Sequence, residues 1–565
     1  MGRKKGVDTQ LNVTRGFVTE FTPVAFPREA ALDVDNCVMD KDGSVRRRPG
    51  IDLERQFSLN TVPGGIINDV VVGEINFSTH LWEFVSNSGT LNIIVVQSGA
   101  TLQFFAQFGA VSSNLLGVVQ LTSYAVDLNK LRREPIVVSS GLGNLYITNP
   151  YMEPLRISYD GTTFEATPIN IRIRDQEGID DTLAIDERPS ILFRNHYYNL
   201  RNQGWTDVNI KLFAGVDEGI DLCQVSGNVG GVVGTNTFPS NSDIMQVGIV
   251  TNSDGNLVFD GEFIRGDNLG NTPAPKGRFV LDAFAKDRDA ALNCIGTSQT
   301  FFPRRPEAVA FHQGRAFFTT ANLQNAVGGV FYSQQLVTPD LDGDCFQAAD
   351  PTASEINDLI DTDGGFLPMP GVGQIYSLVE IGNGIAVIAS NGVWYITGAS
   401  IDSGITATSI RLDKISKFGA LGPSSVVEAE GSVFYFGIDG ILQLSIGESF
   451  SLTAKNITND TIQSFYIVIA AESRRDASAV YIAEERKIYW AYREEIEGVT
   501  PSIISKNKFL ILDFDVGGFY KYSITESQGQ FPEIIGLTFV KPLAEQGALV
   551  PVVELNGDIV TELDL

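Results

Sequence analysis

The chain has 565 residues, with 41 lysines and arginines against 68 aspartates and glutamates, and a formal net charge of −27. This length allows several domains with large cores, and a hydrophobic content of 43% excludes a disordered acidic tail. An acidic field repels phosphate, so the composition also argues against tight binding of duplex DNA through its backbone.

The spacing of the cysteines and the length of the apolar runs indicate the cellular compartment of the chain. Its four cysteines lie far apart, without the spacing of a zinc site or the density of a disulfide scaffold, so we expect free thiols in a reducing compartment. No apolar stretch follows the basic residues at 3–5, and the longest apolar run, 465–471, is far shorter than the ~20 residues of a membrane helix. We therefore expect no secretion signal, no membrane span and synthesis in a cytoplasm.

Residues 1–60 are predicted to form an N-terminal arm and a turn segment. The stretch 21–27 holds two prolines and two phenylalanines, which favours an extended segment lying on other protein. A turn at 41–44 precedes three adjacent arginines, which could bind phosphate but which, in so acidic a chain, we expect to pair with protein carboxylates. The candidate assembly contacts are Phe21, Pro23, Phe26, Pro27, Arg46, Arg47 and Arg48.

Residues 61–205 and 301–565 consist of short β-prone runs joined by tight turns. Such runs flank Ser98-Gly99, Asn391-Gly392 and Asp439-Gly440, which predicts hairpins with type I′ turns. The interval from Gly392 to Gly440 is 48 residues, typical of one propeller blade. The sequence thus predicts a mainly β protein, a β-propeller of antiparallel four-stranded blades in two parts, 61–205 and 301–565. Sandwich domains are the alternative.

The segment 206–300 has a different composition. Glycine-rich stretches such as 227–231 and a proline-containing stretch at 271–277 replace the hairpins, and we predict an inserted β-rich domain between the two parts of the propeller. Helices are expected to be few. The best candidate is 457–471, which opens with the cap donors Thr458, Asn459 and Asp460.

No residue pattern predicts a catalytic, cofactor-binding or metal site. The histidines His80, His196 and His312 occur without a metalloprotease motif, and neither a nucleophile elbow nor a phosphate loop is present. The acidic stretch 340–344 has its glycine at the fourth position rather than the sixth, so it fails as a calcium loop. We expect His312 to be a structural imidazole, and the protein to be neither an enzyme nor a cofactor carrier.

Segments along most of the chain carry motifs that occur together in one family. They are 19–27, 33–37 and 42–50 in the arm, 238–244 and 276–284 in the predicted insertion, and 305–306, 311–315 and 391–394 in the predicted propeller. Together they resemble the tail nozzle (tail tubular protein B-like) proteins of short-tailed bacteriophages, the podoviruses. The resemblance implies a structural virion protein built on a β-propeller with inserted domains.

The same resemblance implies partners and a location. Copies of the chain would form a hexameric ring below the portal and adaptor, enclosing the channel of genome ejection. Partners would be an adaptor or portal-side tail protein and a tail fibre or a tail tip or needle protein. DNA would pass without specific binding, since an acidic wall keeps a polyanion unbound. The location would be the virion tail, after synthesis in the host cytoplasm. An acidic surface kept for solubility explains the charge nearly as well.

Two alternatives stay open. A propeller glycosidase or sialidase-like enzyme would place an arginine cluster and carboxylates at one end of the propeller. A carbohydrate-binding receptor-recognition protein would carry aromatic side chains on exposed loops, whereas 35 phenylalanines against 4 tryptophans favour core filling.

Overall fold

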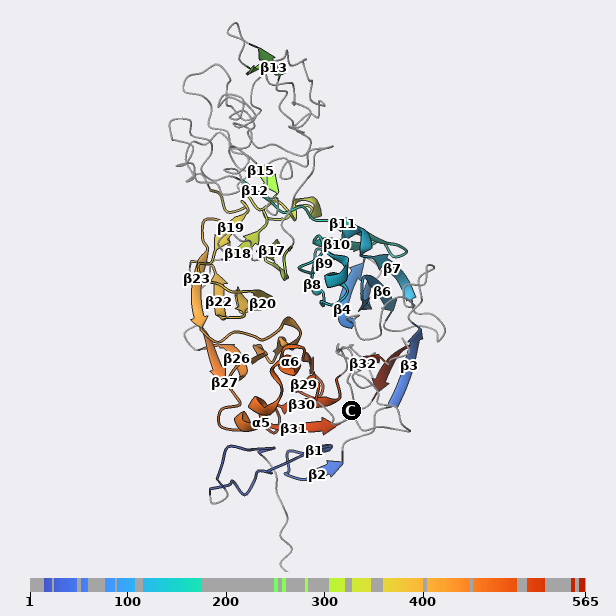
Figure 1. Ribbon diagram of the computed structural model, residues 1–565, viewed down its shortest axis with the longest axis vertical. Coiled ribbons are helices and arrows are strands. Elements are labelled where there is room, and N and C mark those ends of the chain that lie inside the picture. The colour runs from blue at the N-terminus through green and yellow to red at the C-terminus, as the bar shows by residue number, and fades with distance from the viewer. Residues whose placement is uncertain are drawn as a thin grey trace, which may run out of the picture.

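The computed structural model shows a molecule organised around one axis (Figure 1). It describes residues 15–22, 25–47, 52–58, 77–86, 89–106, 115–174, 248–251, 257–260, 280–282, 304–320, 328–346, 359–399, 404–447, 451–494, 506–523, 550–553 and 558–563.

Six antiparallel four-stranded sheets surround this axis as the blades of a β-propeller, which confirms the predicted fold. Blade 1 holds β4 (Phe77–Ser86), β5 (Gly89–Ser98), β6 (Thr101–Ala106) and β7 (Leu115–Gln120). Blade 2 holds β8 (Val137–Gly141), β9 (Asn144–Thr148), β10 (Leu155–Tyr159) and β11 (Phe164–Pro168). Blade 3 holds β16 (Val309–His312), β17 (Arg315–Thr319), β18 (Gly329–Tyr332) and β19 (Gly365–Pro368).

The other three blades follow in the second half of the chain. Blade 4 holds β20 (Ile375–Ile381), β21 (Gly384–Ala389), β22 (Gly392–Thr397) and β23 (Arg411–Ser416). Blade 5 holds β24 (Val427–Ala429), β25 (Ser432–Gly437), β26 (Gly440–Ile446) and β27 (Leu452–Asn456). Blade 6 holds β28 (Ser478–Ile482), β29 (Lys487–Tyr492), β30 (Lys508–Asp513) and β31 (Gly518–Ser523). Strands are ordered in each blade as in the chain, and first strands such as β8 and β20 lie towards the axis (Figure 1).

A three-stranded sheet joins the two ends of the chain. Its order is β3 (Asp52–Ser58), β33 (Asp558–Leu563) and β32 (Val550–Val553), all antiparallel. This sheet lies between blade 6 and blade 1 (Figure 1). Pairing of the N-terminal β3 with the C-terminal β33 therefore completes the circle of sheets.

The chain leaves the propeller after blade 2 and returns before blade 3. Strand β12 (Arg172–Arg174) pairs with β15 (Val280–Asp282), and β13 (Gly248–Thr251) pairs with β14 (Leu257–Asp260). Apart from β13, β14 and β15, the predicted inserted domain 206–300 lies outside the described residues. Its proposed boundaries stay a prediction.

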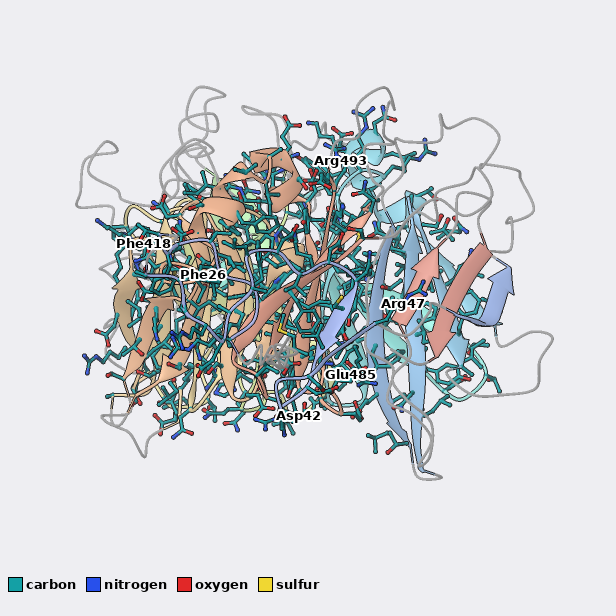
Figure 2. All side chains as sticks on the ribbon, turned by 90° about the horizontal axis from the view of Figure 1, so that it is seen from below. Phe26, Asp42, Arg47, Phe418, Glu485 and Arg493 are labelled. Carbon is teal, nitrogen blue, oxygen red and sulfur yellow. The ribbon has the colours of Figure 1, made fainter. Side chains whose placement is uncertain are left out.

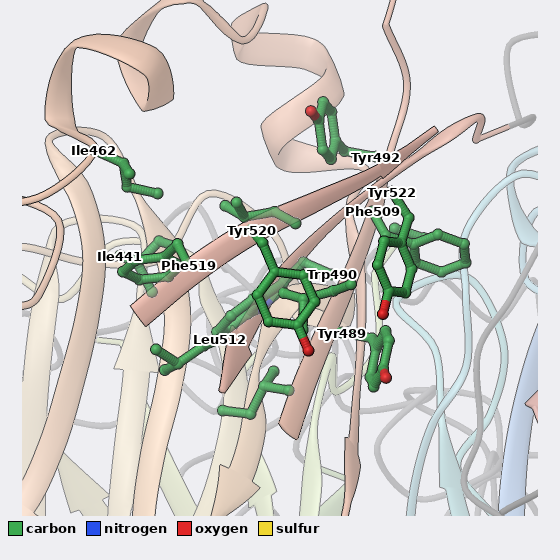
Figure 3. Close-up of a cluster of buried hydrophobic side chains, with 14 of the residues drawn as sticks. Ile441, Ile462, Tyr489, Trp490, Tyr492, Phe509, Leu512, Phe519, Tyr520 and Tyr522 are labelled. Carbon is green, nitrogen blue, oxygen red and sulfur yellow. The ribbon is translucent and has the colours of Figure 1, made fainter. Parts of the chain in front are cut away.

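The hydrophobic core lies between neighbouring blades. In β22, Trp394 and Ile396 pack in a cluster with residues of blade 3, whereas Val393 and Tyr395 pack in a cluster with residues of blade 5. Both faces of a blade are thus covered, which is why a strand such as β21 is continuously apolar instead of alternating. The largest cluster joins blades 5 and 6 around Trp490 (Figure 3).

The predicted hairpins form, but the predicted turn type is wrong at Asn391-Gly392. Ala389 pairs with Gly392, so the turn residues are Ser390 and Asn391, and neither has a positive φ. Gly392 follows the turn with φ 156°, and a Cβ there would lie 2.6 Å from the Ser416 carbonyl oxygen. The Asp439-Gly440 hairpin is built in the same way, with φ 145° at Gly440. Glycine is needed for its φ and for the close approach of a neighbouring segment.

Turns with positive φ at both central residues occur at another position. They connect the first and second strands of blades 2, 3 and 5, at Leu142-Gly143, Gln313-Gly314 and Glu430-Gly431. The first residue of each turn is leucine, glutamine or glutamate, whereas asparagine and aspartate favour this turn. The three turns therefore do not match its sequence motif.

Within the described residues helices are few, as predicted, and short. They are α1 (Leu128–Leu131), α5 (Gln463–Val468) and α6 (Ala471–Arg475), with 3₁₀ turns η2 (Thr122–Tyr124), η5 (Pro339–Leu341) and η6 (Pro423–Ser425). The predicted helix 457–471 is wrong in its bounds, because the Thr458 hydroxyl bonds to the Asn456 and Gln463 side chains and the backbone turns before α5. None of the described helices is long and apolar enough to cross a membrane.

The N-terminal arm lies on blade 6 of its own chain. The Phe17 amide donates to the Phe519 carbonyl at 2.8 Å, and the Asn36 amide donates to the Lys521 carbonyl at 2.8 Å. The Lys521 ammonium lies 2.7 Å from an Asp33 oxygen and 4.9 Å from the Phe17 ring centre. The arm continues into the hairpin of β1 (Cys37–Met39) and β2 (Val45–Arg47). It covers the outer edge of β31, which would otherwise expose unpaired backbone groups.

Candidate functional site

Adjacent arginines followed by a carboxylate stand just before the first strand of three blades. The segments are Arg132-Arg133-Glu134 before β8, Arg304-Arg305-Pro306-Glu307 before β16, and Arg474-Arg475-Asp476 before β28. First strands of propeller blades run in the same direction beside the axis, so their starts gather at one end. We call this end, with Arg493 after β29, the arginine end.

Two of these arginines hold the fold together. Arg305 is 4% exposed and forms two parallel hydrogen bonds of 2.8 Å with the Glu153 carboxylate of blade 2. Arg474 donates to the Ile438 carbonyl at 2.8 Å and lies over the Tyr466 ring. Their guanidinium groups link one blade to the next.

Arg304 and Arg475, which precede blades 3 and 6, both act electrostatically on Glu134, which precedes blade 2. Surrounding protein raises the pKa of Glu134, although its side chain still reaches solvent, and Arg475 and Arg304 oppose this shift. The same two arginines act on Tyr376 of β20, whose pKa burial raises. Four segments distant in sequence therefore place two guanidinium groups, carboxylates and a phenol within electrostatic range of one another.

Among these carboxyl groups, Glu307 has the pKa that lies furthest above its ordinary value. Its side chain is 7% exposed and pairs with Arg304. Burial raises the pKa of Glu307 to about 7, because desolvation outweighs the attraction of Arg304. A carboxyl that is half protonated near neutral pH can donate or accept a proton, as a general acid or base must.

Replacing Glu307 by glutamine is expected to change how stability depends on pH. The folded pKa lies above the ordinary 4.5, so the contribution of Glu307 is complete below pH 4.5 and is lost as pH rises through 7. At pH 8 the variant should equal or exceed the wild type, by up to about 3 kcal/mol. Urea unfolding at pH 5 and pH 8 measures this. Exposed Glu165→Gln is the control, and a wild-type stability that rises from pH 5 to 8 relative to Glu307→Gln would contradict the argument.

The opposite end of the propeller is acidic. Arg493 follows β29 and Glu485 precedes it, and the two lie at opposite ends of the molecule (Figure 2). Arg486, next to Glu485, lies 3.0 Å from carboxylate oxygens of both Glu430 and Asp515. We call this the acidic end, with the turn carboxylates Asp160, Asp361, Glu430, Glu484, Glu485 and Asp515.

Two of the three histidines lie in first strands of blades, His80 in β4 and His312 in β16. His312 is almost buried, with Nδ1 3.3 Å from a Glu380 carboxylate oxygen. Burial lowers the pKa of His80 to about 4, and its Nε2 lies 3.2 Å from the Ser78 hydroxyl. His196 lies outside the described residues. Within the described part of the chain, histidine, cysteine, aspartate and glutamate form no group of three that could hold a metal ion.

The predicted assembly residues lie on the outer side of the arm. Phe21 is 39% exposed, and Phe26 and Pro27 are half-buried. Arg46 and Arg47 are exposed, and Arg46 lies 3.2 Å from Asp40 of the same hairpin (Figure 2 labels Phe26 and Arg47). Pro23 and Arg48 lie outside the described residues. Their contact with a neighbouring protein stays a prediction.

The sequence contains a signal for the arginine end that lies outside the motifs considered above. Apart from 46–48, adjacent arginines occur only at 132–133, 304–305 and 474–475. Each pair precedes the first strand of a blade by three or four residues. The signal is thus an Arg-Arg dipeptide that recurs shortly before the first strands of blades.

The fold defines the chain as a β-propeller protein. No protein-family model matches the chain, and no curated protein is similar to it. Among solved structures, apo AztD from Citrobacter koseri is 10% identical and has a TM-score of 0.30, over 80% of this chain and 87% of that one. The β-propeller domain of Cps50 (Swd1) from Myceliophteria thermophila is 9% identical with a TM-score of 0.25, over 57% and 93%. Likeness at this level carries no argument about function.

Proposed function

We propose that the protein is a structural virion protein, one subunit of a hexameric ring that forms the tail nozzle of a short-tailed bacteriophage. The ring would enclose the channel of genome ejection and serve as an attachment platform. Its partners would be an adaptor or portal-side protein and a tail fibre or tip protein, and its location the virion tail. No enzyme activity is part of this proposal.

The observation that carries the proposal is the position of the family-like motifs within the propeller. Segment 33–37 runs along β31, where the Ser523 hydroxyl donates to Asp35 at 2.6 Å. In segment 311–315, Arg315 is 2% exposed and donates to the Ser333 and Asp363 carbonyls at 2.6 Å. Residues with such roles attach the arm and a loop to the blades, as a protein with a mechanical role needs.

The charge of the chain also supports the proposal. A net charge of −27 per chain, repeated around a ring, would keep a passing duplex from adhering to the wall. DNA would slide through without specific contacts.

Electron microscopy of the purified full chain tests this function. We expect negatively stained particles to show a six-fold ring with an axial opening. Monomers or trimers at micromolar concentration would contradict the nozzle.

A sialidase-like or other propeller glycosidase is the second candidate, because Arg304 and Arg475 meet Glu134, Glu307 and Tyr376 at one end of the propeller. A propeller glycosidase is expected to carry such an arrangement of arginines and carboxylates at one end. Sugar release from bacterial surface polysaccharide by the purified protein, abolished in Glu307→Gln, would establish it. If the purified protein releases no sugar in this assay, the glycosidase is wrong and the structural role is favoured.

A further inference from the structure

The two ends of the propeller carry different charge. Described segments at the arginine end hold about as many basic as acidic residues, and Arg133 and Arg475 are exposed there. Described turns at the acidic end are dominated by carboxylates, of which Asp160, Asp361 and Glu484 are exposed. In a chain of net charge −27, the arginine end is thus the less acidic of the two.

Protonation adds to this difference. Burial raises the pKa of Glu307 to about 7 and also raises that of Glu134. The groups facing these carboxyls are Arg304, Arg475, Asp476 and Tyr376. Near neutral pH Glu307 is therefore partly uncharged, which lowers the negative charge at the arginine end.

The two ends do not neutralise each other within one molecule. They are separated by the length of a blade strand, roughly 17–20 Å for five or six residues. The screening length at physiological ionic strength is about 8 Å. Each end is therefore available to a separate partner.

We propose that the arginine end of one copy docks against the acidic end of a second copy of this chain. The argument is charge complementarity: an acidic chain meets another copy of itself at lowest electrostatic cost through its least acidic surface. The contact joins two different surfaces, so it is heterologous. Because the two ends face opposite ways, copies that dock in this manner follow one another in a row, and the row closes into a ring only if each copy is tilted relative to the one before it. The inference rests on the proposed ring and names the surfaces that build it.

Charge reversal tests the contact. The variant Arg133→Glu with Arg475→Glu changes the arginine end, and Glu430→Lys with Glu484→Lys changes the acidic end; all four side chains are exposed. Each double variant should raise the dissociation constant of the oligomer at least about a hundred-fold, since like charges then face each other. The quadruple variant again pairs opposite charges and should recover the oligomer. Mass photometry at low and high salt measures these changes.

The control has the same change of charge on the side of the propeller. Lys414→Glu with Lys455→Glu lies within the outer strands β23 and β27 and should leave the oligomer unchanged. Far-UV circular dichroism checks that each variant is folded. Loss in both doubles with recovery in the quadruple variant supports the inference. Loss without recovery, or doubles that behave as wild type, overturns it.

The assembly state of the wild-type protein distinguishes a failure of this inference from a failure of the proposed function. If the wild type is monomeric at all concentrations, both the contact and the ring are wrong. If it forms a six-fold ring that ignores the reversals, the ring stands and this contact is wrong. If it forms charge-dependent assemblies that are not six-fold rings, the contact stands and the nozzle is wrong.

Discussion

Trp490→Ala is expected to lower the free energy of unfolding by about 3–5 kcal/mol, as for other large aromatic residues deleted from a core. Trp490 is fully buried between blades 5 and 6 (Figure 3). Its ring stacks on Phe436 with centres 5.4 Å apart, and its Nε1 donates to the Ser425 carbonyl at 3.1 Å. The substitution therefore leaves a cavity at a blade junction and a buried carbonyl without this donor.

Urea unfolding followed by circular dichroism measures the loss. Trp490→Phe keeps most of the apolar volume but not the N–H donor, so it should cost about 1–3 kcal/mol. Val468→Ala, at a side chain that is 82% exposed, should stay within about 0.5 kcal/mol of wild type. Equal midpoints for Trp490→Ala and Val468→Ala would show that the junction between blades 5 and 6 does not limit stability.

Arg156→Met is expected to destabilise the protein at pH 8 by about 3–5 kcal/mol, because it leaves a buried charge unpaired. Arg156 Nη1 lies 2.9 Å from Asp342 Oδ2, and the two side chains are 13% and 7% exposed. Burial raises the pKa of Asp342 to about 6 even with Arg156 opposing it. Without the arginine this pKa should rise further.

The effect should depend on pH in one direction. A carboxyl with a folded pKa above the ordinary 3.8 contributes fully at low pH, and its contribution is lost as pH rises through the folded value. Arg156→Met should therefore recover stability between pH 8 and pH 5. Adding Asp342→Asn should restore much of the loss at pH 8 and remove the recovery at low pH. A loss that is the same at both pH values would show that Arg156 acts by packing alone.

Hairpins and buried strands were predictable because they depend on residues close in sequence. The apolar run of β21, a two-residue turn and the β-prone run of β22 together specify one hairpin. Its recurrence at blade spacing then predicts a propeller. The absence of helix from the described part of the arm was also predictable, since its prolines disfavour a helix.

The type of each turn does not depend only on residues close in sequence. A Cβ at Gly392 would lie 2.6 Å from the carbonyl oxygen of Ser416 in the fourth strand, and that close approach exists only once the blade has formed. The bounds of α5 likewise depend on Thr458, whose hydroxyl also accepts from the Ile441 amide of blade 5. In both cases a tertiary contact outweighed the local preference.

The sequence by itself determined the class of secondary structure, the blade repeat and the acidic charge, because these follow from composition and from neighbours along the chain. Only the tertiary structure decided that Glu134, Arg304 and Arg475 meet at one end of an axis and that burial moves the pKa of Glu307 to about 7. The physical reason is that convergence requires several blades and the pairing of β3 with β33, from opposite ends of the chain. Desolvation, likewise, depends on atoms brought near by folding and not on neighbours in sequence.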